Sequence, residues 1–262
     1  MNGAGRILST LAGIVYAMIL APIVVVVALA FSADDFIVFP PSGYSFRWFE
    51  ALAGNGPLLD ALLLSAQIAC VVTALSLLLG VPAALALNKG SFPGREALQG
   101  FFLAPLLLPT LIIGLALLLF FTPLHLTATL PGLVLGHMIV TLPFVIRMMT
   151  TAFSTLPDDI EAAAATLGAT PWRVVCRVTL PLAAPGLVAC GALSFLLSFD
   201  ETVISLFIAG PRASTLPVEM VRYVEGRTDP MVAALSVVLI AATLLVVILV
   251  ERLVGVARAV GN

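Results

Sequence analysis

The chain has 262 residues, of which 61% are hydrophobic and only 10% charged, with a formal net charge of -2 at pH 7. Soluble domains have roughly 45–50% apolar and about 25% charged residues, so these few charges cannot cover a water-facing surface. The 12 Lys+Arg against 14 Asp+Glu leave no basic field for nucleic acid, and the apolar content excludes disorder. The composition therefore predicts an integral membrane protein.

Long uncharged runs predict how often the chain crosses the bilayer, since a spanning helix needs about 20 mainly apolar residues. Such runs cover residues 7–33, 61–88, 97–146, 178–199 and 230–250. The third is too long for one helix and contains a turn at residues 122–132, whereas the fourth continues past Asp200 and Glu201. We therefore expect an all-α protein, a single domain over 1–262, whose six transmembrane helices lie at roughly 7–32, 60–87, 98–121, 131–150, 182–208 and 231–252.

The basic residues predict the orientation, because Lys and Arg collect on the cytoplasmic side. If both termini lie on one side, that side carries eight of them: Arg6, Lys89, Arg95, Arg147, Arg173, Arg177, Arg252 and Arg258. The other side carries four: Arg47, Arg212, Arg222 and Arg227. Both termini are therefore predicted to be cytoplasmic. The first apolar run exceeds the core of about 7–15 residues of a secretory signal, so it is expected to stay as a helix.

Two external connections are longer than turns. The first, residues 34–59, carries five aromatic side chains: Phe36, Phe39, Phe46, Trp48 and Phe49. The second, residues 210–230, predicts a short amphipathic helix around 217–223, since Val218, Val221 and Val224 share a face while Glu219 and Arg222 point away. Each segment can either contact a partner protein or anchor and cap the bundle at the membrane interface.

The cytoplasmic segment between the fourth and fifth predicted helices, residues 155–181, predicts two short helices. The first, of about 11 residues, starts after Pro157, with acids near the end where the helix dipole favours anions. A run of alanines continues it, and Gly168 supplies a left-handed ending. Thr170 can cap a second helix that begins at Pro171. The small alanine side chains let another protein approach closely.

No catalytic constellation accompanies this segment. The sequence holds no phosphate-binding loop, zinc-protease motif or nucleophile elbow. Its cysteines, Cys70, Cys176 and Cys190, lack disulfide or zinc spacing and are interpreted as packing residues. His125 and His137 are too isolated to suggest a metal site. Any chemistry that drives this protein is therefore expected in another chain.

The cytoplasmic segment resembles the signature of the inner-membrane permeases of binding-protein-dependent ABC importers. Glu161-Ala162-Ala163, Gly168, Val178 and Leu180-Pro181 stand at its spacing, with Val178 in place of Ile. The resemblance implies a type I importer permease fold and assigns these residues to a coupling helix that docks on a cytoplasmic ATPase. It further implies a bacterial inner membrane location, a second permease subunit, two ATPase subunits and an extracytoplasmic substrate-binding protein. No cofactor is expected on this chain, since ATP and Mg would bind to the ATPase.

A second resemblance concerns the cargo. Ser198-Phe199-Asp200-Glu201, with residues 208–211 and 215–217, is similar to the shorter permease of the spermidine/putrescine subgroup, which implies a polyamine or a related amine-bearing solute. Ferric ion, thiamine, opine or amino-acid cargo is the alternative within the class. Asp200 and Glu201 would lie in the outer part of the fifth helix, and one of them, Asp200 first, is predicted to line the pathway. The other interpretation is an intersubunit hydrogen bond, or an interfacial location without a substrate role.

An ion-coupled secondary transporter is the competing class. Intramembrane acids such as Asp200 and Glu201 are typical of it. That class does not explain the cytoplasmic signature.

Overall fold

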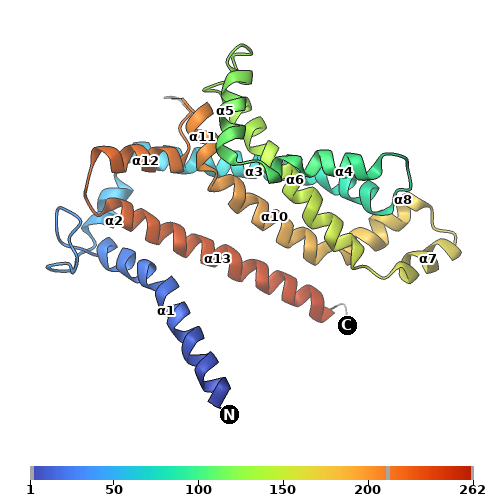
Figure 1. Cartoon of the computed structure of the whole chain (residues 1–262), viewed down its shortest axis with the longest axis horizontal. Coiled ribbons are helices and arrows are strands. Elements are labelled where there is room, and N and C mark those ends of the chain that lie inside the picture. The colour runs from blue at the N-terminus through green and yellow to red at the C-terminus, as the bar shows by residue number, and fades with distance from the viewer. Residues whose placement is uncertain (1–2, 211–212, 261–262) are drawn as a thin grey trace. The chain divides into compact units, whose positions relative to one another are not determined.

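The computed structural model describes the backbone of residues 3–210 and 213–260, and side chains within 8–157, 159–210 and 213–252 (Figure 1). Helices dominate this described part, in which no strand occurs. Their bounds are α1 Gly3–Ala30, α2 Arg47–Ala53, α3 Gly56–Lys89, α4 Arg95–Leu103, η1 Ala104–Leu107, α5 Thr110–Phe121, α6 Leu130–Ser154, α7 Asp158–Thr166, α8 Pro171–Val174, η2 Val175–Thr179, α9 Leu180–Leu182, α10 Ala184–Phe199, α11 Thr202–Ile208, α12 Leu216–Gly226 and α13 Met231–Val260.

The chain forms two compact units. The first runs to Asp60 and resumes from Glu219 to Leu244, so it holds α1, α2 and the first half of α13. The second comprises Ala61–Val218 and the chain from Leu245 onward. It therefore contains the segment with the importer signature and the two predicted pathway acids.

Four described helical segments are long and apolar enough to span a membrane: Leu8–Ala30, Gly56–Lys89, Leu130–Ser154 and Met231–Arg252. Two bent helix pairs raise the number of candidate spans to six, as the sequence predicts. Arg95–Leu107 meets Thr110–Phe121 at 100°, and Pro171–Leu182 meets Ala184–Phe199 at 69°. All-α architecture is therefore confirmed, but two of the spans are not straight helices.

The expected continuous helix over 98–121 is wrong. The chain turns at Leu108, whose backbone is extended with φ -92° and ψ 142°. A residue before proline is sterically disfavoured in the helical region, and Pro109 has no N–H to continue the hydrogen-bond ladder. The uninterrupted apolar run does not indicate this break, because hydropathy does not depend on whether the backbone of a residue can be helical.

The expected helix over 182–208 is also interrupted. α10 ends at Phe199, and Asp200 and Glu201 form a junction before α11 begins at Thr202. A carboxylate oxygen of Glu201, Oε1, accepts a hydrogen bond of 3.1 Å from the backbone N–H of Ile204. Glu201 is thus the N-cap of α11, and the two acids are not neighbours on one helix.

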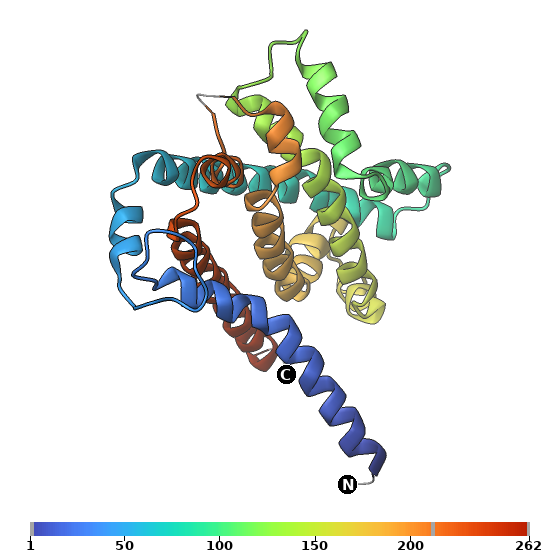
Figure 2. The same ribbon diagram turned by 60° about the vertical axis from the view of Figure 1, so that its left-hand side comes forward.

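The core of the second unit holds this junction in place. α10 packs on α6, and α11 packs on both α5 and α6; α5 and α11 lie side by side in Figure 1 and Figure 2. A Cβ atom at Gly114 of α5 would lie 2.5 Å from Cδ2 of Phe207, so only glycine permits this approach. The buried cluster around the contact comprises Ile68, Val72, Ile113, Leu117, Phe121, Leu133, Val140, Ile204, Ile208 and Ala213.

In the first unit, α1 is an apolar helix with little cover from its own chain. Leu8, Met18 and Val24 are 70%, 75% and 65% exposed. A continuous apolar surface of this kind is stable only against lipid or another apolar protein surface. The exposure therefore fits a helix that faces lipid or another apolar protein surface.

Candidate coupling loop and polar junction

The first helix of the cytoplasmic segment, α7, has 9 residues, close to the expected length. It ends as predicted: Gly168 has φ +82°, in the left-handed region. The N–H of Gly168 donates to the carbonyl of Ala165 (2.9 Å), and that of Ala169 donates to Ala164 (3.1 Å). This pair of bonds is a Schellman ending, which satisfies the last carbonyls and turns the chain sharply.

The second helix of the segment begins at Pro171, as predicted, with Thr170 at the N-cap position. The predicted side-chain cap is wrong, because the Thr170 side chain makes no capping hydrogen bond. After Val174 the backbone widens into the π-helix η2 before α9 and α10. π-helical turns frequently occur at functional sites, and this one joins the cytoplasmic segment to a membrane span.

The signature glutamate, Glu161, lies where three elements meet. Its carboxylate pairs with Lys89, the last residue of α3, and accepts a hydrogen bond of 2.7 Å from the Thr179 hydroxyl of η2. Burial raises the pKa of the Glu161 carboxyl, but the hydrogen bonds from Lys89 and Thr179 outweigh it and hold the pKa below its usual 4.5. Sequence reasoning missed these partners, since they are distant along the chain.

The outer surface of the segment is apolar and open. Leu167 and Trp172 are 89% and 76% exposed, on either side of Gly168. Of the predicted coupling residues, Ala162, Ala163, Gly168 and Pro181 are exposed, whereas Glu161, Val178 and Leu180 are half-buried. Leu167 and Trp172 are thus large apolar side chains that their own chain leaves uncovered. The sequence analysis named the alanines but not Leu167 and Trp172.

A buried polar cluster flanks the junction between α10 and α11. His137 of α6 is 2% exposed, and its Nδ1 and Nε2 atoms lie 3.0 and 2.9 Å from the hydroxyls of Ser198 and Ser205. His137 therefore has two polar partners in the folded chain, both of them serine hydroxyls. Its partners are 61 and 68 positions away in the chain, so only tertiary packing brings them together.

The two predicted pathway acids differ in their surroundings. Asp200 is exposed, whereas Glu201 is half-buried and caps α11. Asp200 is therefore the more exposed of the two carboxylates in the single chain. No group of three or more His, Cys, Asp or Glu side chains within the described residues could hold a metal ion.

The cysteines do not share one environment. Cys190 is buried and belongs to a hydrophobic cluster with Met149 and Phe153. Cys70 and Cys176 are exposed in the single chain, so the interpretation of all three as packing residues holds within this chain only for Cys190.

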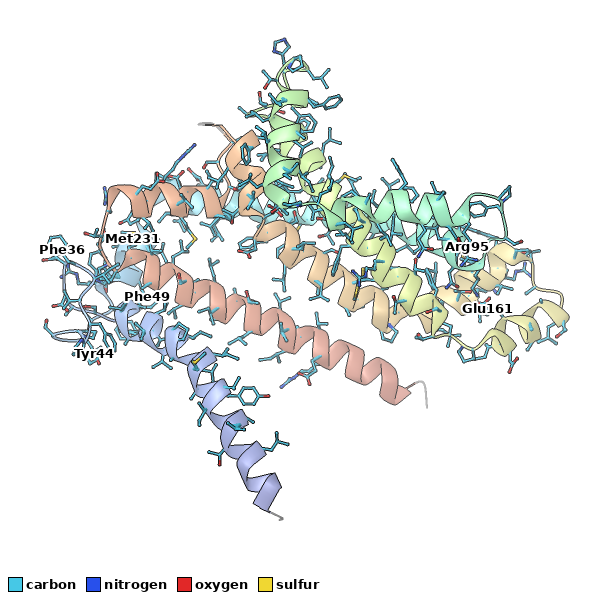
Figure 3. The ribbon with its side chains drawn as sticks, viewed as in Figure 1. Phe36, Tyr44, Phe49, Arg95, Glu161 and Met231 are labelled. Carbon is cyan, nitrogen blue, oxygen red and sulfur yellow. The ribbon has the colours of Figure 1, made fainter. Side chains whose placement is uncertain are left out.

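The first external connection is an ordered aromatic loop. Phe31, Phe46 and Phe49 form a cluster with ring centroids 5.0 to 6.1 Å apart, and Figure 3 shows Phe36, Tyr44 and Phe49 gathered in this loop. Phe36, Phe39 and Tyr44 are 66%, 60% and 72% exposed, whereas Trp48 on α2 is buried. The predicted aromatic surface is therefore present without Trp48.

The second external connection contains the predicted amphipathic helix, α12. Val218 is buried, but Val224 is 54% exposed, so the valine face is covered only at its start. Glu219 and Arg222 form an ion pair with an N–O distance of 3.5 Å. The hydroxyl of Tyr223 lies 2.8 Å from an Asp229 carboxylate oxygen, and Asp229 accepts a hydrogen bond from the N–H of Met231 at the start of α13.

This fold is that of a helical membrane protein with up to six spans in its described part. The chain matches the family described as binding-protein-dependent transport system inner membrane component over residues 76–257, and it belongs to that family. It is a multi-pass inner-membrane permease subunit of an ABC importer, which confirms the predicted class over a secondary transporter. It is a transport subunit, not an enzyme.

Curated relatives and solved structures agree with this assignment. The spermidine/putrescine transport system permease protein PotC of Haemophilus influenzae is 29% identical over 90% of this chain and 91% of its own length. A putative 2-aminoethylphosphonate transport system permease protein, PhnV of Salmonella paratyphi A, is 35% identical over 81% of each chain. A chain of the bacterial alginate ABC transporter, crystallised with a pentasaccharide-bound periplasmic protein, superposes with a TM-score of 0.71 at 17% identity, over 94% of this chain and 92% of that chain. The last likeness supports the predicted permease fold.

Proposed function

We propose that this chain forms half of the translocation pathway of an ATP-driven importer for polyamines or a related small amine-bearing solute. A second permease subunit forms the other half, two cytoplasmic ATPase subunits bind ATP and Mg, and an extracytoplasmic binding protein delivers the solute. Both termini lie in the cytoplasm, and residues 1–262 work as one permease domain that includes the coupling loop 155–181.

The coupling loop is the observation that carries this proposal. The Schellman ending at Gly168 holds α7 and α8 in a sharp turn that presents Leu167 and Trp172 outward. A few well-packed residues, Trp among the commonest, carry most of the binding energy of protein interfaces, and near-neutral contacts around them exclude water. The exposed alanines let the ATPase surface approach closely, while the two large side chains supply the anchors.

The mechanism is alternating access driven from this loop. Closure of the ATPases on ATP pushes the coupling helix, and the movement enters the membrane through η2 and α9, which lead directly into α10. The 69° bend between these segments turns a push on the loop into a displacement of α10. α11 follows, since both helices pack on α6.

The substrate class rests on chemistry that two relatives share. Spermidine, putrescine and 2-aminoethylphosphonate each carry a primary amine, which is cationic at neutral pH. Asp200 offers an exposed carboxylate at the α10–α11 junction. A carboxylate in a region of low dielectric attracts an ammonium group more strongly than it does in bulk water.

Reconstitution of the complete importer tests the proposal. The expected result is that spermidine- or putrescine-loaded binding protein stimulates both ATP hydrolysis and uptake into proteoliposomes. Stimulation only by a ferric ion, thiamine, opine or amino-acid binding protein would overturn the substrate class. Absence of stimulation by every loaded binding protein would overturn the importer mechanism.

ATPase binding is tested separately by truncating the exposed anchor. Trp172→Ala should weaken ATPase association about thirtyfold, the loss expected for an interface anchor worth about 2 kcal/mol. Tyr44→Ala is the matched control, because Tyr44 is similarly exposed (72%) but lies in the external loop. Equal association of ATPase with both variants would contradict the docking surface.

A further inference from the structure

Three side chains from three elements converge on one point of the second unit. Lys89 is the last residue of α3, Glu161 lies in α7 and Thr179 ends the π-helix η2. The Glu161 carboxylate pairs with Lys89 through Oε2 and accepts the Thr179 hydroxyl through Oε1. Figure 3 labels Glu161 in this region. We call these three residues the Glu161 junction.

Burial makes the junction more than a surface ion pair. The Glu161 side chain is 18% exposed and that of Lys89 30%, while Thr179 is fully buried. Fully exposed ion pairs contribute little, and removal of one partner from a buried pair leaves a charge without compensation. The Lys89–Glu161 pair is partly buried, with Glu161 the better covered of the two, so loss of Lys89 leaves the Glu161 carboxylate without its cation. The position of α7 is therefore sensitive to Lys89.

A groove lies between α7 and the end of α3, beside the Glu161 junction. α7 packs against α8 and η2, and the groove has a volume of about 720 Å³. Its lining includes Pro82, Leu85 and Ala86 of α3 and Ala162 and Ala165 of α7. The small side chains on the α7 side leave this groove open. The Lys89–Glu161 pair bridges it.

The far end of this bridge is itself connected to a second span. Asn88, the neighbour of Lys89, donates a hydrogen bond of 3.4 Å from Nδ2 to the carbonyl of Thr150 in α6. A displacement of α7 that is transmitted through Lys89 therefore reaches both α3 and α6. The route is distinct from the covalent one through η2 into α10.

We propose that Lys89 is a positioning residue for energy coupling: through Glu161 it transmits the movement of the coupling helix to α3. The inference rests on the proposed function, since it presumes that an ATPase moves α7. Without Lys89, the ATPase still docks on Leu167 and Trp172 and still hydrolyses ATP. A smaller part of each ATP-driven movement of the ATPases then reaches the membrane spans, because α7 shifts across the open groove.

The test uses the reconstituted importer and measures the amount of solute transported per ATP hydrolysed. Lys89→Met keeps the length of the side chain and removes its charge. It should lower this ratio about fivefold and leave ATPase association unchanged. Lys89→Arg should restore the ratio. Arg147→Met is the matched control, because it removes an exposed basic side chain of α6 that lies outside the Glu161 junction.

A double-mutant cycle separates this role from direct contact between Glu161 and the ATPase. Glu161→Gln should lower the ratio as Lys89→Met does, and the double variant should show no further loss. Additive losses, or a wild-type ratio in Lys89→Met, would overturn the inference. If Lys89→Met does not insert, Glu161→Gln and the near-isosteric Thr179→Val provide the same readout. Failure of the wild-type complex to bind ATPase would instead reject the proposed function, so the two failures are distinguishable.

Discussion

The imidazole of His137 lies 3.0 Å from the hydroxyl of Ser198, two residues before Asp200. The other ring nitrogen bonds to Ser205 in α11, so one side chain of α6 holds the helices on both sides of the acidic junction. Neutral histidine has one donor and one acceptor nitrogen, and a serine hydroxyl can serve either. The cluster therefore satisfies its buried polar groups without a charge.

Replacement of this histidine should destabilise the bundle. His137→Leu leaves the Ser198 and Ser205 hydroxyls without their partner, which should cost about 1–2 kcal/mol. The midpoint of thermal unfolding in detergent measures the loss. His137→Leu combined with Ser198→Ala and Ser205→Ala should recover part of it, because no stranded hydroxyl is left. An unchanged midpoint in His137→Leu would contradict the role of the cluster.

The two junction acids should respond differently to removal of charge. Asp200→Asn should raise the KM for a cationic solute, because it removes the exposed carboxylate. Glu201→Gln should have a smaller effect, because an amide oxygen can still accept from the N–H of Ile204. Glu201→Ala should lower the free energy of unfolding by about 1 kcal/mol, because α11 loses its N-cap. Initial uptake rates against solute concentration test this prediction, and wild-type KM in Asp200→Asn would reject the pathway role.

The ending of the coupling helix should tolerate only residues that accept a left-handed backbone. Gly168→Val should cost at least about 1 kcal/mol of strain at φ +82°, and misplaced docking residues should then reduce ATPase association. No atom lies within 4 Å of a Cβ built there, so the effect is conformational and not steric overlap. Gly168→Asn is the control, since asparagine adopts this conformation readily. Equal association for both variants would refute the prediction.

Acid should weaken the Glu161 junction in a defined pH range. The pKa of Glu161 is lower in the folded chain than its usual 4.5, so the charged pair stabilises the fold fully above that pH. The stabilisation is lost as the pH falls through the lowered pKa. The difference in Tm between wild type and Glu161→Gln should therefore be constant above pH 4.5 and shrink below it. A pH-independent difference would show that this carboxylate does not titrate as expected.

Substitutions in the external helix α12 should show whether this helix contacts the binding protein. Exchanging the charges with Glu219→Arg and Arg222→Glu preserves an i,i+3 pair but reverses its polarity. We expect impaired stimulation by the binding protein with unchanged basal ATP hydrolysis. Unchanged stimulation would favour the capping role. Glu96→Gln, on α4 of the second unit, provides a charge-change control.

Local features of this protein could be predicted from its sequence because they depend on neighbouring residues. Hydropathy predicts the apolar spans, and Gly168 and Pro171 predict the turn of the coupling loop. The spacing from Glu161 to Pro181 indicates the importer family. The break at Leu108 could also be predicted from the sequence, because Pro109 follows it. The uninterrupted apolar run instead favoured one continuous helix.

Tertiary structure alone decided which polar groups meet. His137 finds Ser198 and Ser205, and Glu161 finds Lys89 and Thr179, through contacts between elements far apart in the chain. The different surroundings of Asp200 and Glu201 follow from the helix break and the packing of α11 on α5 and α6. Sequence determines composition, periodicity and backbone preference, whereas the partner of a buried polar group depends on the packing that brings distant helices together.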